Sequence, residues 1–108
     1  MKTEKYITSP IPVKGYGNTD GIIAAVAKAT GVPGKKILSK SKVWPCVEAR
    51  LLLILLLSHT GLVDQKIAWT VGRGRASVCK SRHVAENLLD VSKTFRQKFI
   101  DLKKTIEL

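Results

Sequence analysis

Five cations lie in one short stretch of the sequence, from Val63 to Arg82, where the residue types suit the binding of phosphate. These cations are Lys66, Arg73, Arg75, Lys80 and Arg82. No acidic residue stands between Asp64 and Glu86. Lysine and arginine pair with phosphate oxygens, and arginine can also donate two hydrogen bonds to one guanine. The stretch therefore predicts binding to a polyanion, and more specifically to nucleic acid.

The same stretch predicts two helices joined by a tight turn. The first is expected over Val63–Val71, because its apolar residues recur at helical spacing. Gly72 and Gly74 are expected to supply the backbone freedom that the turn needs. The second helix begins with basic and small residues. A helix pair with one apolar side and cations at its turn is typical of a helix-turn-helix unit that binds DNA.

A second basic segment, Lys35–Lys42, holds four lysines and no acid. We expect Lys40 and Lys42 to contact phosphates from this segment. The next helix is predicted from Pro45 to about Thr60, since proline favours the first helical position and a glycine follows the end. Arg50 lies in its first turns and is expected to emerge at the basic side of the molecule.

The composition indicates one basic domain. The chain has 108 residues and 19 Lys and Arg against 8 Asp and Glu, a net charge of +11. Such a surface attracts phosphate polymers or anionic membranes. The apolar run Leu51–Leu57 is too short to span a bilayer, which takes about 20 residues, and predicts a helix buried on nearly all sides. No secretory signal is evident, so we expect a cytoplasmic protein with two free, buried cysteines.

The predicted organisation is an irregular arm over residues 1–18, a helix-turn-helix domain over 19–92, and a C-terminal helix over 93–108 packed on the same domain. No alternating pattern of a strand occurs. The predicted fold is an all-α bundle of five to six helices. Trp44 is expected to pack against the helix that follows it. Trp69 lies on the face opposite Ile67 and Ala68, which would leave it partly exposed for contact with another chain or the arm; the alternative, which we expect, is a place at the periphery of the core.

Four segments, taken in order, carry a resemblance to a known family. They are Lys36–Lys42, Val47–Arg50 with the apolar helix after it, His59–Leu62, and Ile67–Arg73. From Asp20 to about Leu89 the chain resembles domain IV, the C-terminal DNA-binding domain of the bacterial replication initiator DnaA, as a small stand-alone relative. The resemblance covers roughly two thirds of the chain.

The resemblance implies a recognition helix in the major groove and a basic loop on phosphates. The family's G-R-D-H-[ST]-T-V signature is matched here by Gly72–Val78, in which Arg73, Ser77 and Val78 fit. The segment Gly74–Ala76 departs from the signature at positions that read bases in the family. The family's minor-groove arginine corresponds to Arg50 or a position near it.

The expected function is binding to double-stranded DNA, in replication initiation or in transcription control. The residues expected to contact DNA are Lys40, Lys42, Arg50, Lys66, Arg73, Arg75, Ser77, Lys80 and Arg82. Neither an enzyme nor a metal, cofactor or membrane partner is expected, because no constellation in the sequence suits one; Gly34-Lys35-Lys36 is not a phosphate-binding Walker loop. Two alternatives stay open. One is an interaction module that keeps the scaffold and binds a protein or a second copy. The other is sequence-blind packaging of nucleic acid.

Overall fold

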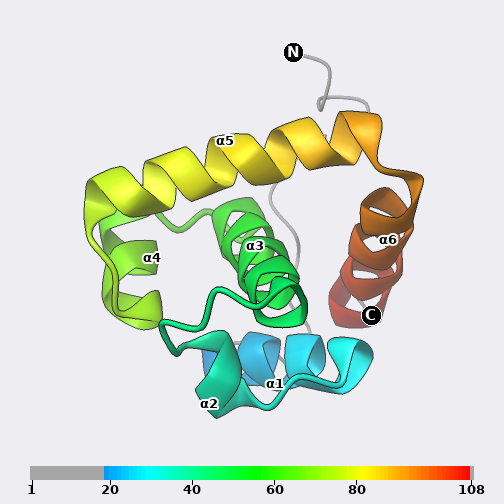
Figure 1. The fold of residues 1–108 in the computed structure, drawn as a ribbon, viewed down its shortest axis with the longest axis horizontal. Helices are drawn as coiled ribbons and strands as arrows, with labels where there is room; N and C mark the ends of the chain where they lie inside the picture. Colours follow the sequence, from blue (N-terminus) through cyan, green and yellow to red (C-terminus); the bar gives the residue numbers. More distant parts are fainter. Residues whose placement is uncertain (1–18, 108) are drawn as a thin grey trace.

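The computed structural model describes residues 19–107 of the chain, and in this part it has six α-helices and no strand (Figure 1). The helices are α1 (Thr19–Thr30), α2 (Gly34–Ile37), α3 (Trp44–His59), α4 (Asp64–Val71), α5 (Arg75–Val91) and α6 (Lys93–Glu107). The predicted all-α fold is confirmed. The arm expected over residues 1–18 lies outside the described residues.

Helix α3 forms the centre of the molecule. Figure 1 shows α5 crossing it on one side and α1 on the other, with α4 and α6 at the two flanks. Every residue of Leu51–Leu57 is 5% exposed or less. Burying one leucine or isoleucine contributes about 1.5–3 kcal/mol, so these two turns of α3 supply much of the core. The prediction of a helix buried on nearly all sides is confirmed.

Helix α6 is attached to the end of α5 through a one-residue break at Ser92. The Ser92 backbone is extended, and its Oγ accepts a hydrogen bond from the Phe95 amide at 3.2 Å. The Arg96 side chain donates to the carbonyls of Leu89 and Asp90 at 2.8 and 2.9 Å, which caps the C-terminus of α5. The buried stripe of α6 is Phe95, Phe99, Leu102 and Ile106. It packs α6 against α1, α3 and α5.

Helices α4 and α5 are joined by Gly72, Arg73 and Gly74. Gly72 has a φ of 69°, the left-handed conformation that ends many helices and that side chains disfavour. Gly74 has an ordinary φ of −72°, so only one of the two glycines expected to need freedom does so. The core-facing residues expected on α4, which include Ile67 and Val71, are buried.

Both tryptophans lie at the surface, Trp44 as the first residue of α3 and Trp69 on α4. Trp44 is 53% exposed and Trp69 is 71% exposed, so neither packs into the core. Both cysteines are free thiols; Cys46 is buried, whereas Cys79 is only half-buried. Among the described residues, no helix combines the length and the apolar character that crossing a bilayer would require.

Candidate nucleic-acid interface

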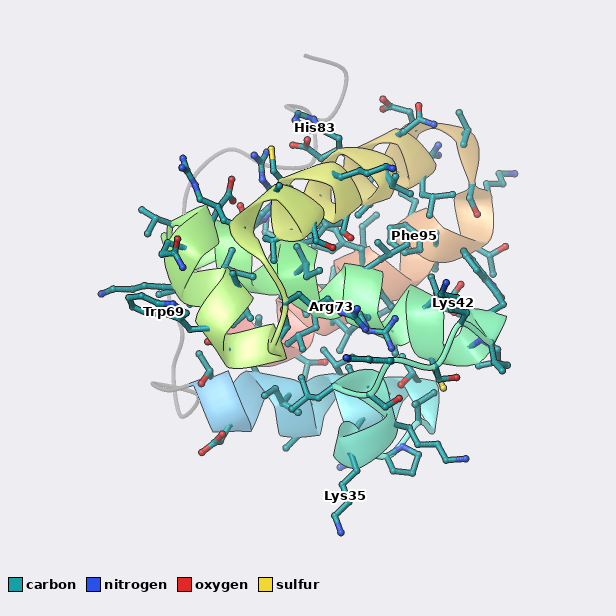
Figure 2. All side chains as sticks on the ribbon, turned by 60° about the vertical axis from the view of Figure 1, so that its left-hand side comes forward. Lys35, Lys42, Trp69, Arg73, His83 and Phe95 are labelled. Carbon is teal, nitrogen blue, oxygen red and sulfur yellow. The ribbon has the colours of Figure 1, made fainter. Side chains whose placement is uncertain are left out.

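The two basic segments of the sequence meet in space. The loop between α2 and α3 lies against the turn between α4 and α5, and the Nη2 of Arg73 donates to the carbonyl oxygen of Ser39 at 2.7 Å. Figure 2 shows Arg73 reaching from the turn toward the loop that carries Lys42, while Trp69 projects to the side from α4. One face of the molecule is therefore built from residues more than 30 positions apart.

The first turn of α5 stands at this face and is open to solvent. Arg75, Ala76 and Ser77 are all exposed, as is Lys80 one turn later, whereas Val78 is fully buried and anchors the helix. The cap residue Gly74 offers no side chain to the first amides of the helix. Free amides and the helix dipole make such an end attractive to an anion.

Among the described residues, no ion pair joins the exposed cations of this region to a carboxylate. These cations are Lys40, Lys42, Lys66, Arg75 and Lys80. The nearest acids along the chain from the turn, Asp64 and Glu86, both pair with Arg82 instead. The charge of the five exposed cations is thus left to attract an external anion.

Arg82 serves the structure of the helix pair. Its Nε and Nη2 donate to the two carboxylate oxygens of Asp64, each at 3.2 Å, and its Nη1 lies 3.6 Å from Glu86. The hydrogen bonds from Arg82 to Asp64 raise the pKa of Arg82, against a lowering by burial. The side chain thus joins α4 to α5, and the expected contact of Arg82 with DNA stays a prediction.

Arg50 does not emerge at the basic side of the molecule, so this expectation was wrong, whereas its contact with DNA stays a prediction. The residue is 8% exposed. Its Nε donates to the Ile37 carbonyl at 2.9 Å, and its Nη2 donates to the carbonyls of Ser39 and Ser41 at 2.6 and 3.1 Å. Burial and then the nearby charge of Arg73 lower the pKa of Arg50 from its usual high range. The arginine faces inward and holds the loop from behind.

Two serines that the sequence analysis left unassigned shape the same loop. Ser39 Oγ donates to the Lys36 carbonyl at 2.6 Å and accepts the Ser41 amide at 3.2 Å. Ser41 Oγ accepts the Val43 amide at 3.3 Å. Serine commonly closes such local turns. The Ser39-Lys40-Ser41-Lys42 alternation is the signal that could have predicted serines turned to the backbone and lysines turned to solvent.

The structure thus sorts the nine expected contact residues into two groups. The exposed group is Lys40, Lys42, Lys66, Arg75, Ser77 and Lys80. The other group, Arg50, Arg73 and Arg82, is engaged within the protein. No protein-family model matches the chain, and a search of curated proteins finds no similar sequence.

Proposed function

We propose that this chain binds double-stranded DNA, with α4 and α5 as a helix-turn-helix and α5 as its recognition helix. The observation that carries the proposal is the open, acid-free first turn of α5, placed beside a basic loop on the same face. A recognition helix of this kind enters the major groove with its N-terminal residues at the base edges. The likeness to domain IV of DnaA supports the same assignment.

The exposed residues divide by reach into phosphate and base contacts. Lys40, Lys42 and Lys66 lie on the loop and on α4, and they suit backbone phosphates. Arg75 and Lys80 on α5 suit guanine O6 and N7, and the Ser77 hydroxyl suits any base edge. Each good base contact of this kind contributes about 1–3 kcal/mol of discrimination. The proposed role is replication initiation or transcription control.

The test is duplex binding by fluorescence anisotropy across a range of salt concentrations. If Lys40, Lys42 and Lys66 each neutralise one phosphate, log K falls with log salt at a slope of about −2.7. Arg75→Ala/Lys80→Ala should weaken binding at least tenfold at about 0.15 M salt. The matched control, Lys93→Ala/Lys104→Ala, removes two exposed charges from α6 and should have a smaller effect. Equal binding to scrambled duplexes and to RNA would favour sequence-blind packaging instead.

A second candidate function rests on Trp69, which projects from α4 with 71% of its surface exposed. An exposed tryptophan is a frequent anchor of protein–protein interfaces. On this alternative the scaffold binds a protein or a second copy of the chain. No duplex binding, together with a stable complex that Trp69→Ala abolishes, would select this function over the first.

A further inference from the structure

Two arginines from different elements converge on one backbone atom. Arg50 of α3 and Arg73 of the α4–α5 turn each donate through Nη2 to the carbonyl oxygen of Ser39, at 2.6 and 2.7 Å. Within the part of the chain that the structure describes, neither arginine pairs with a carboxylate. Two like charges are therefore held together without a counter-charge, and the adjacent Lys40 and Lys42 add to the same sign.

The loop in front of these arginines turns three of its carbonyls toward Arg50. The carbonyls of Ile37, Ser39 and Ser41 all accept hydrogen bonds from Arg50. The amide of Ser41 donates to the Ser39 hydroxyl. The amides of Lys40 and Lys42 donate to no group among the described residues. Both lysine side chains are exposed as well.

We propose that Ser39–Lys42 is a preformed cradle for one phosphate of a nucleic-acid backbone, with Arg50 and Arg73 as its positioning residues. Two amides and two ammonium groups would supply the contacts, while the arginines stay behind the loop. Turning three carbonyls inward removes the partial negative charges that would repel a phosphate. This inference rests on the proposed function, because it names the phosphate contact of the same face.

The shared carbonyl of Ser39 also links the cradle to α5. Arg73 precedes the recognition helix by two residues and is tied to the loop by its bond to Ser39. A phosphate held at Lys40 and Lys42 would therefore fix the position of the N-terminus of α5 relative to the DNA backbone. Contacts to phosphates set the register of a protein on the duplex in this way.

The experiment is an NMR titration of the full ¹⁵N-labelled chain, first with inorganic phosphate and then with a 20-base-pair duplex. Sodium chloride at equal ionic strength is the control. The cradle predicts that the Lys40 and Lys42 amides shift with phosphate and with duplex, but not with chloride. If these amides stay in place while the duplex binds, the cradle is overturned and the proposed function stands. If they shift with phosphate while no duplex binds, the cradle stands and the proposed function falls.

A double-mutant cycle separates positioning from direct contact. Arg73→Lys keeps the charge on a half-buried side chain, so the fold should survive. Arg50→Lys tests the second arginine that donates to the Ser39 carbonyl. Each should reduce the salt slope of duplex binding by about one, the value for one lost phosphate. Combined with Lys42→Ala, Arg73→Lys should add little further loss, because both changes disable the same cradle. Fully additive losses would mean that Arg73 touches phosphate itself, which overturns the positioning role.

Discussion

His59, the last residue of α3, should make the stability of this protein depend on acid. The residue is 5% exposed, and its ring meets the edge of Phe99 with 5.0 Å between the ring centroids. Neither ring nitrogen has a hydrogen-bond partner among the described residues. Burial, and secondarily the charge of Lys103, lower the pKa of His59 from 6.5 to about 4. The folded protein thus holds this histidine neutral where the unfolded chain would protonate it.

The sign and size of the effect follow from these two pKa values. Because the folded pKa is the lower one, the unfolded state binds more protons between pH 6.5 and 4, and stability falls as the pH falls through this window. Protonation of this one group favours unfolding by about 2 kcal/mol at pH 5 and by only about 0.2 kcal/mol at pH 7. Below pH 4 the folded state is protonated as well, so this group causes no further loss of stability.

The assay is urea unfolding of the wild type and of His59→Leu at several pH values, followed by circular dichroism. Leucine removes the titrating group and the two unpaired nitrogens. The free energy of unfolding of the variant, relative to that of the wild type, should therefore rise by about 2 kcal/mol from pH 7 to pH 5. His83→Gln, a change at an exposed histidine of α5, is the control. If the difference between His59→Leu and wild type grows no more with acid than that of the control, the reasoning about burial is refuted.

Two further predictions concern stability at neutral pH. Gly72→Ala should cost about 1 kcal/mol of stability because Gly72 has a φ of 69°. Gly74→Ala should be close to neutral, because Gly74 has a φ of −72° and open space around it. Equal losses of stability in thermal unfolding would contradict the assigned turn. Trp69→Ala should change stability by less than about 0.5 kcal/mol, because the side chain is exposed, while Leu55→Ala in the core should cost about 2–5 kcal/mol. A large loss for Trp69→Ala would place that indole in the core after all.

The helices could be predicted from the sequence because their causes are local. Apolar spacing, Pro45, and the glycines after α1, α3 and α4 mark each element, and the buried stripe of α6 is legible in its four apolar positions. Helical position places Trp69 on the face opposite Ile67, and the structure confirms the exposed alternative rather than the place at the periphery of the core.

The partners of the arginines could not be predicted, because they depend on contacts between distant parts of the chain. Arg82 bonds to Asp64, which is 18 residues away in the sequence, and Arg73 bonds to the Ser39 carbonyl, which is 34 residues away. Each of these arginines resembles an exposed phosphate contact in the sequence. Only the packing of the loop against the turn shows that Arg50 and Arg73 point inward, so the lysines between the serines are left as the outward donors.

The most direct test of the account is a map of the surface that meets DNA. Chemical shifts of the labelled chain should be followed as a short duplex is added at about 0.15 M salt. The account predicts that the largest changes fall on Ser39–Lys42, on Gly72–Lys80 and on Lys66, with little change along the exposed side of α6. Changes centred on α6, or no change at saturating duplex, would contradict it.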